Sequence, residues 1–227
     1  MAKAFKGQPK LVVLTLITLT LAFFLASSFY KEELPKAISI DTSGLPTIGN
    51  SYCKVQIVVF EEPQCSACRK FNEVVFPEIE KNFINTGKVK YTVVPVAFIQ
   101  GSKLAAESMY CVYHQDKQYP NPELFLRYLD TIYSNNEEGK EDLSSKEALI
   151  MMAKSASSAI DIEKLNDCLE SQEERVNIIK NTKLAKKTMD DALSTPRVYV
   201  NGIRSKSNEY KDIKELVELC YKLRDQL

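Results

Sequence analysis

Two cysteines separated by two residues, Cys65 and Cys68, constrain the fold of this chain more than any other feature. They follow an apolar, β-branched run at residues 54–60 that does not alternate with polar residues, which predicts a strand buried on both faces of a sheet. After the cysteines, apolar residues recur at helical spacing through residues 69–82, and a second Val- and Tyr-rich run occupies residues 89–98. The sequence therefore predicts a strand–Cys-X-X-Cys–helix–strand unit of the βαβ type.

A long segment without convincing strand patterns follows this unit. Residues 101–192 hold several amphipathic stretches separated by prolines and polar clusters, which predicts a helical insertion. Strand character returns at residues 197–200, Asn201-Gly202 favours a hairpin turn, and the chain closes with an amphipathic helical pattern. We therefore expect one α/β domain whose first part is residues 51–100 and whose last part is residues 193–227.

The N-terminus has the pattern of an export signal. Lysines precede an uncharged, mainly apolar run at residues 11–29, within which Ala26-Ser27-Ser28 supplies the small residues that a signal peptidase requires. We expect residues 1–30 to be a cleaved signal peptide. The alternative is an uncleaved membrane tether, because the apolar run approaches the ~20 residues that span a bilayer. Both place the rest of the chain outside the cytoplasm, and residues 31–50, with their Pro, Gly and polar side chains, are expected to be a linker.

Charge and residue usage exclude several classes of function. The 30 basic and 30 acidic residues balance and no basic stripe stands out, so nucleic-acid binding is not expected. The chain has six cysteines and one histidine, His114. Apart from Cys65 and Cys68, no cysteine pair has the spacing of a zinc site, and a single histidine does not complete a Cys₂His₂ set. No metal site is therefore expected.

A Cys-X-X-Cys pair at the predicted start of a helix is typical of thiol–disulfide exchange. Two sulfurs one helical turn apart can form a strained, reducible disulfide. The sulfur of Cys65 faces unpaired backbone N–H groups and the positive end of the helix dipole, and both stabilise its thiolate. Cys68 lies one turn further in, where it is shielded and can resolve a mixed disulfide. The alternatives are half of a zinc site or a buried structural bridge.

Sequence runs at both ends of the predicted domain resemble the DsbA family. The first contains Ile48-Gly49, the strand Val55-Gln56-Ile57-Val58-Val59-Phe60 and the run Gln64-Cys65-Ser66-Ala67-Cys68, and the second is Thr195-Pro196-Arg197-Val198-Tyr199-Val200-Asn201-Gly202. The similarity covers roughly residues 48–222. It implies a thioredoxin-like fold with a helical insertion domain, and an enzyme that exchanges dithiols and disulfides.

The resemblance also implies roles for further residues. It implies that the Thr195–Pro196 bond is cis and lies against Cys65, so that Thr195 offers backbone groups to an extended substrate. An ordinary trans proline that opens an edge strand is the alternative. The Ser66-Ala67 dipeptide between the cysteines is similar to that of DsbA proteins from obligate intracellular bacteria. Some relatives carry a non-catalytic disulfide in the insertion, which implies a Cys111–Cys168 bond here; two buried free thiols are the alternative.

Two positions depart from the family pattern. Many members have a buried glutamate in the strand before the Cys-X-X-Cys, where this chain has Val59, and we expect the nearby Glu61 and Glu62 to lie at a solvated strand end. The strongest oxidants of the family have a histidine directly before the second cysteine, where this chain has Ala67. With no imidazole and no buried carboxylate near the pair, we expect a weaker oxidant than those relatives.

Three remaining residues are assigned no functional role. His114 is expected on an exposed helix face. Cys53 and Cys220 are expected to be small apolar packing residues, with a Cys53–Cys220 disulfide left open as the alternative.

We predict an exported thiol:disulfide oxidoreductase that introduces disulfides into periplasmic or secreted proteins. By resemblance, its substrates are exported proteins that contain cysteines, its re-oxidant is a DsbB-type membrane quinone reductase, and it needs no organic cofactor. One alternative is a reductase or isomerase that a membrane donor keeps reduced. The alternative from another class is a metal chaperone that uses the two thiolates, and the absence of a Met-rich or His-rich tract counts against it.

Overall fold

The computed structural model describes residues 12–21, 36–136 and 143–224. The chain divides at Pro35 into two compact units. In the first unit, residues 12–21 form a helix with exposed side chains, and no helix among the described residues is long and apolar enough to cross a membrane. The rest of the predicted signal peptide or tether, at residues 1–11 and 22–30, lies outside the described residues.

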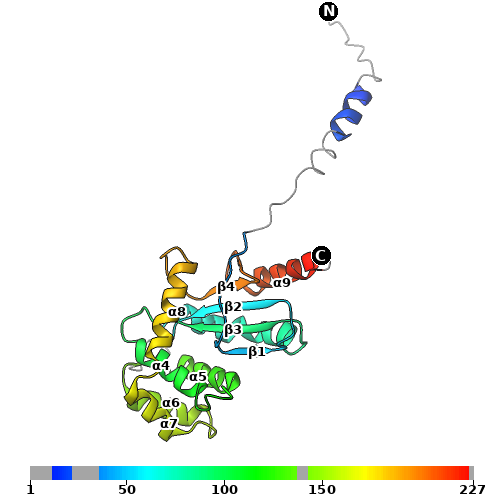
Figure 1. Cartoon of the computed structure of the whole chain (residues 1–227). Helices are drawn as coiled ribbons and strands as arrows, with labels where there is room; N and C mark the ends of the chain where they lie inside the picture. Colours follow the sequence, from blue (N-terminus) through cyan, green and yellow to red (C-terminus); the bar gives the residue numbers. More distant parts are fainter. Residues whose placement is uncertain (1–11, 22–35, 137–142, 225–227) are drawn as a thin grey trace, which may run out of the picture. The chain divides into compact units, whose positions relative to one another are not determined.

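The second unit is built on a mixed sheet (Figure 1). The central strand has Ile57, Val58, Val59 and Phe60 at most 3% exposed, which confirms the prediction of a strand covered on both faces. It is parallel to one neighbour and antiparallel to the other, and both outer pairs are antiparallel. Within the described residues, the strand order is β1 (Thr47–Gly49), β3 (Lys90–Pro95), β2 (Gln56–Glu61), β4 (Arg197–Val200) and β5 (Ile203–Arg204).

Strand β1 falls within the segment that the sequence predicts to be a linker. Ile48 pairs with Tyr91 of β3, and the hydroxyls of Thr47 and Thr92 lie 2.8 Å apart in a hydrogen bond. A strand of three residues is too short to show an alternating pattern, and it is fixed by pairing with a distant segment. The linker prediction is therefore wrong for residues 47–49.

Three short helical segments replace the single helix predicted after the cysteines. Pro77 lies in the first turn of the second segment, where its missing N–H is tolerated, but its ring cannot be accommodated inside a continuous helix. The predicted apolar face is retained, because Phe71, Ile79 and Phe83 are all buried. The segments are α2 (Ser66–Val74), α3 (Phe76–Ile79) and the π-helical turn η1 (Glu80–Ile84).

Between β3 and β4 the described chain is helical, as predicted for residues 101–192. Side chains of Asn121, Ser145 and Asp161 each accept a backbone N–H at the start of a helix, which fixes where these helices begin. The helices are α4 (Lys103–Tyr113), α5 (Pro122–Asn135), α6 (Lys146–Ala156), α7 (Ile162–Ser171) and α8 (Arg175–Thr188), and α9 (Tyr210–Arg224) follows β5.

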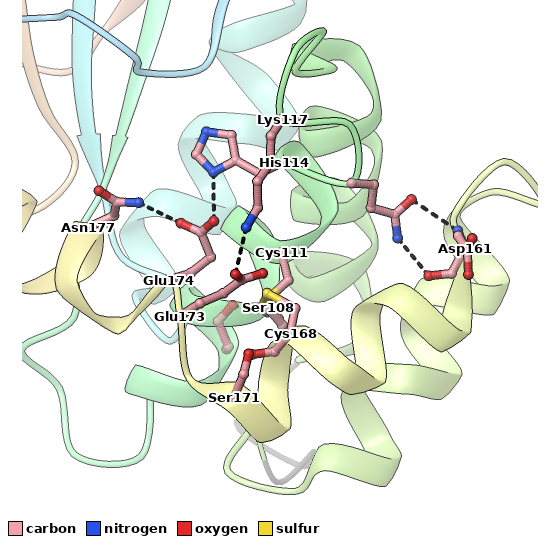
Figure 2. The surroundings of a disulfide bond; sticks show 12 residues. Ser108, Cys111, His114, Lys117, Asp161, Cys168, Ser171, Glu173, Glu174 and Asn177 are labelled. Carbon is pink, nitrogen blue, oxygen red and sulfur yellow. Dashed lines mark hydrogen bonds and ion pairs between the residues drawn. A yellow bond between two sulfur atoms is a disulfide. The ribbon is translucent and has the colours of Figure 1, made fainter.

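A disulfide between Cys111 and Cys168 joins α4 to α7 (Figure 2). Both cysteines are buried, and this is the bond that the family resemblance implies. Cys53 and Cys220 are free thiols and do not bridge. Cys220 is buried against β4 as predicted, whereas the half-buried Cys53 donates a hydrogen bond to the Gly87 carbonyl oxygen at 2.8 Å.

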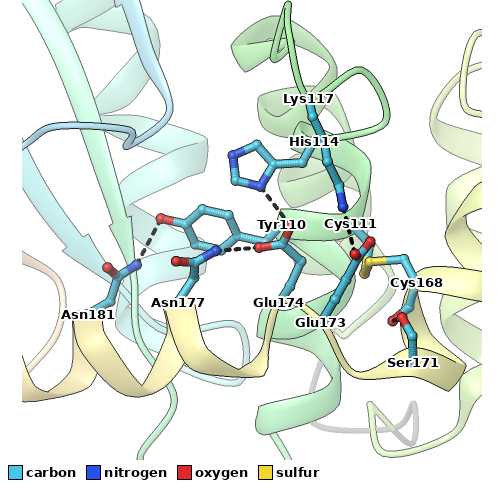
Figure 3. A network of polar contacts seen from close by, with 10 residues as sticks. All are labelled: Tyr110, Cys111, His114, Lys117, Cys168, Ser171, Glu173, Glu174, Asn177 and Asn181. Carbon is cyan, nitrogen blue, oxygen red and sulfur yellow. Dashed lines mark hydrogen bonds and ion pairs between the residues drawn. A yellow bond between two sulfur atoms is a disulfide. The ribbon is translucent and has the colours of Figure 1, made fainter.

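The prediction that His114 lies on an exposed helix face is wrong. His114 ends α4 and is partly buried, with its Nδ1 2.8 Å from Oε1 of Glu174 at the start of α8 (Figures 2 and 3). Burial alone would raise the pKa of Glu174, but hydrogen bonds from His114 and Asn177 outweigh it and hold the pKa below its ordinary value. The turn between α7 and α8 folds back onto the end of α4, and local periodicity gives no signal for such a contact.

Candidate active site

Cys65 occupies the N-cap of α2, and a short turn joins it to the end of β2 at Glu61. Its Sγ accepts the backbone N–H of Cys68 at 3.4 Å and lies 3.3 Å from the carbonyl oxygen of Thr195. Hydrogen bonding from the Cys68 thiol, together with the Thr195 side chain and backbone N–H groups, outweighs the effect of burial and lowers the pKa of Cys65 to about 6. The half-buried Cys65 is therefore mainly a thiolate at neutral pH, which is the reactive form.

Cys68 lies one turn inside α2 and is completely buried. Burial raises its pKa well above 9.0, and the neighbouring Cys65 and Glu61 raise it further. The two thiols are thus perturbed in opposite directions by their positions on one helical turn. Cys65 can attack or leave as a thiolate, whereas Cys68 holds its proton and is shielded from solvent.

The loop before β4 brings a third element to the reactive sulfur. The Thr195–Pro196 peptide bond is cis, and its carbonyl group from Thr195 is the one next to the Cys65 sulfur. Strand β4 then pairs antiparallel with β2, with Arg197 opposite Phe60. Pairing of these two strands therefore holds the cis bond against the N-terminus of α2.

Glu61 is buried beneath the two cysteines, which contradicts the prediction of a solvated strand end. Its side chain is 2% exposed and accepts hydrogen bonds from the hydroxyls of Tyr133 at 2.9 Å and Tyr91 at 3.4 Å. Burial raises the pKa of Glu61 to about 7, although the two tyrosine hydroxyls act in the opposite direction. The buried carboxyl group missing at Val59 is thus present two residues later in the same strand.

Glu62 is also completely buried, so the expectation of a solvated strand end is wrong for both residues. One carboxylate oxygen accepts the backbone N–H of Gln64 at 2.7 Å, and the other has no hydrogen-bond partner among the described residues. Burial raises the pKa of Glu62 to about 7, although the nearby Ser102 and the backbone N–H of Gln64 act in the opposite direction. Glu62 therefore shapes the turn that leads from β2 to Cys65.

A small surface pocket opens beside Cys65, between the start of α2 and the end of α5. Tyr133 lines this pocket and is also the tyrosine that hydrogen-bonds to Glu61, so it connects the buried carboxyl group to the surface next to the reactive sulfur. Among the described residues, no group of three or more His, Cys, Asp or Glu side chains is arranged to hold a metal ion. The pocket is lined by Pro63, Gln64, Cys65, Ser66, Arg69, Tyr133 and Asn136.

The structure brings the predicted residues Cys65, Cys68 and Thr195–Pro196 together from opposite ends of the sequence, with Ser66-Ala67 in the first turn of α2 between the two sulfurs. Glu61, Tyr91 and Tyr133 were not among the predicted site residues. A usable signal was present, since two carboxyl residues directly follow an unbroken apolar strand run and precede the cysteines. The tyrosines come from β3 and α5, and only the tertiary fold brings them to Glu61.

Comparison with known proteins places this geometry among thiol–disulfide exchange proteins. The sequence model of a family described as Thioredoxin matches residues 41–219. Among curated proteins, disulfide bond formation protein D of Bacillus subtilis is 30% identical over 177 residues, which cover 77% of this chain and 76% of that protein.

Solved structures give the same result. The crystal structure of Chlamydia trachomatis DsbA is similar with a TM-score of 0.74 and 32% identity, over 84% of this chain and 98% of that one. Oxidised BdbD from Bacillus subtilis is similar with a TM-score of 0.71 and 28% identity, over 81% of this chain and 96% of that one.

Proposed function

Because the chain belongs to the DsbA family of thioredoxin-fold thiol:disulfide oxidoreductases, we propose that it is a dithiol oxidase whose reactive pair is Cys65 and Cys68. The observation that carries the proposal is the placement of two thiols on one helical turn: Cys65 is half-buried at the N-cap of α2, where its sulfur accepts the Cys68 N–H, and Cys68 is completely buried. This placement lowers the pKa of Cys65 and raises that of Cys68. The oxidising power of such a pair rises as its reduced form is stabilised, and hydrogen bonds to the Cys65 thiolate contribute to that stabilisation. The substrates are proteins that contain cysteines.

The reaction moves two electrons from a substrate dithiol to the disulfide form of Cys65 and Cys68. A substrate thiolate attacks the Cys65 sulfur, the bond to Cys68 breaks, and Cys68 takes up a proton. The second substrate thiolate then attacks the substrate sulfur of this mixed disulfide and expels Cys65 as a thiolate. The low pKa of Cys65 makes it the better leaving group, which favours completion of the second step.

Thr195 and Pro196 position the substrate in this proposal. The Thr195 carbonyl group lies beside the reactive sulfur, at the start of a strand that continues into the sheet. An extended substrate segment can add to these backbone groups in the way that peptides pair with a sheet edge. Ser66 and Ala67 supply the first turn of α2, whose N–H groups face the thiolate.

Glu61 is placed to handle the proton of Cys68. Its carboxyl group titrates near pH 7, contributes to the raised pKa of Cys68, and is linked through the Tyr133 hydroxyl to the pocket beside Cys65. A general acid or base works best when its pKa is close to the operating pH. We therefore assign Glu61 as the group that exchanges the Cys68 proton with solvent.

The proposal also covers where the protein acts and which partner re-oxidises the Cys65–Cys68 pair. The basic residues and apolar run at the N-terminus support export to the periplasm, with residues 11–29 either removed or kept as a membrane tether. The family membership supports a DsbB-type membrane quinone reductase as the partner that restores the disulfide.

The test is a single-turnover reaction between the oxidised full chain and a reduced peptide with two cysteines. We expect the peptide disulfide to form at the expense of the Cys65–Cys68 disulfide, and Cys65→Ser to abolish the reaction. Cys53→Ser is the matched control, since Cys53 is a free thiol outside the site. Full activity of Cys65→Ser would overturn the proposal, and a reactive pair found reduced in acid-quenched cells would assign a reductase or isomerase instead.

A further inference from the structure

A local concentration of positive charge lies on α8 and the strands next to it. The chain as a whole has no net charge, so this concentration is a property of one surface. Within the described residues, none of these cations is within ion-pair distance of a carboxylate. The exposed Asp41, which lies near Lys180, and the exposed Asp190 and Asp191 after α8 offset only part of the charge. The cations are Lys180, Lys183, Lys186, Lys187, Arg197 and Arg204.

Hydrogen bonds hold the middle of α8 against the end of the sheet that carries Cys65. Asn181 Nδ2 donates to the Pro95 carbonyl oxygen at 3.1 Å and to the Tyr110 hydroxyl at 3.0 Å (Figure 3), and the Thr182 hydroxyl accepts the Ala97 N–H at 3.2 Å. Pro95 ends β3, which is parallel to β2, and the end of β2 is joined to Cys65 by a short turn. In Figure 1, α8 stands at the end to which β2 and β3 point.

The C-terminal end of α8 reaches the other side of the active site. The Tyr199 hydroxyl donates to the Thr188 carbonyl oxygen at 3.3 Å, and β4, which contains Tyr199, begins immediately after the cis Thr195–Pro196 bond. Arg197 and Tyr199 are two residues apart on a strand, so they lie on the same face, toward α8. The helix therefore extends from the end of β3 to the start of β4, along the rim of the site.

Apolar side chains are exposed among these cations. Val176 and Ile179 on α8 are 66% and 42% exposed, and Phe98 and Ile99 in the loop after β3 are 37% and 38% exposed. Ile179 precedes Thr182 by one helical turn, so it lies on the side of α8 that contacts this loop. Exposed apolar residues gathered in one place are typical of an interaction surface.

Arg197 lacks a counterion within this surface. Its Nε is buried and has no hydrogen-bond partner among the described residues, while burial and the nearby charge of Arg204 lower the pKa of its guanidinium group. A buried donor without a partner is costly, and a carboxylate is the ligand that matches a guanidinium group best.

We propose that a surface centred on α8, here termed the α8 surface, binds substrate segments in which acidic and apolar residues flank the reacting cysteine. The α8 surface consists of Phe98, Ile179, Lys183, Lys186, Lys187 and Arg197. The proposal rests on the proposed function, since the segment must bring a cysteine to Cys65. A polypeptide fits better than a lipid surface, because the ligand has to supply carboxylates, apolar groups and a thiol at adjacent positions. Charge complementarity then selects among substrates by accelerating their encounter.

The test compares three dithiol peptides that differ only in the residues that flank their cysteines. These flanking residues are acidic in the first peptide, neutral in the second and basic in the third. With the oxidised full chain at low ionic strength, we expect the acidic peptide to react about tenfold faster than the basic one, and high salt to reduce the difference. Lys183→Glu/Lys187→Glu should abolish or reverse this preference. The matched control is Lys88→Glu/Lys222→Glu, which makes the same charge change at exposed positions near the opposite end of β3 and should keep the preference.

The outcomes separate this proposal from the one on which it rests. Failure of the wild-type chain to oxidise any peptide would overturn the proposed function itself. Equal rates for all three peptides, or a preference that survives Lys183→Glu/Lys187→Glu in a protein with unchanged urea unfolding, would overturn only the α8 surface. If the three peptides react at equal rates, and the protein binds phosphatidylglycerol vesicles in a way that is lost in Lys183→Glu/Lys187→Glu, the cations would be assigned to a lipid surface instead.

Discussion

Replacing Glu61 with glutamine is expected to stabilise the reduced protein above pH 7. The same replacement is expected to slow the step in which Cys68 loses its proton. The folded-state pKa of Glu61 is about 7, against an ordinary value of 4.5, because its ionised form is buried. Stability from this group is therefore fully present below pH 4.5 and is lost as the pH rises to about 7. A difference of about 2.5 pH units at ~1.36 kcal/mol each corresponds to a loss of about 3 kcal/mol above pH 7.

Glutamine avoids this loss because it is neutral at every pH and still offers an oxygen to the hydroxyl of Tyr133. Urea unfolding of the reduced protein between pH 4.5 and 8.5 should show the difference growing with pH. Glu73→Gln is the control, since Glu73 is exposed and paired with Arg69 at the surface. Stability curves of wild type and Glu61→Gln that run parallel across this range would refute the assignment of a buried, titrating Glu61.

The same variant should slow the step in which Cys68 gives up its proton. When the reduced protein reacts with oxidised glutathione, Cys65 forms the mixed disulfide and Cys68 must deprotonate to resolve it. Loss of a positioned base costs about 100-fold in rate. Stopped-flow measurement of this step should also lose its inflection near pH 7 in Glu61→Gln, and an unchanged pH profile would exclude Glu61 from the proton transfer.

Three further results are expected. The rate of alkylation, measured against pH, should show one titration near pH 6, and Cys65→Ser should remove it. Cys68→Ala should move this titration to higher pH, because the Cys68 thiol contributes most to the lowered pKa of Cys65. A faster reaction at Cys68 than at Cys65 would invert the two roles. Cys111→Ala/Cys168→Ala should melt lower yet still oxidise a model peptide, since closing a loop of 57 residues stabilises by at most about 4 kcal/mol in the chain-entropy model; an unchanged melting temperature would argue against that contribution. Ala67→His should shift the glutathione equilibrium toward a stronger oxidant by roughly 30–60 mV, because a charge-assisted hydrogen bond to the thiolate is worth about 1.5–3 kcal/mol; an unchanged equilibrium would show that the dipeptide does not set the potential.

Much of the fold follows from the sequence because its signals are local. The unbroken apolar run predicts the central strand β2, and the helical spacing in residues 101–192 predicts the insertion. The Asn201-Gly202 pair predicts the hairpin between β4 and β5. These features depend on periodicity or turn chemistry within one segment, and the structure contains each of them.

The features that the sequence did not predict depend on contacts between distant segments. Strand β1 is three residues long and is fixed by pairing with β3. Polarity alone predicted Glu61 to be solvated, but Tyr133 of α5 and Tyr91 of β3 close over its carboxyl group. A buried carboxyl group does lie beneath the reactive pair, so only the absence of a histidine at Ala67 still favours a weaker oxidant.

Whether Cys65 is the thiol that binds substrates can be tested by trapping substrates in cells with the Cys68→Ala variant and mapping the linked cysteine by mass spectrometry. Without Cys68, a mixed disulfide at Cys65 cannot be resolved from within the protein, so it should accumulate. We expect disulfide-linked partner proteins joined through Cys65, and their loss in Cys65→Ser/Cys68→Ala. Partners joined through Cys53 or Cys220, or trapped equally well without Cys65, would contradict it.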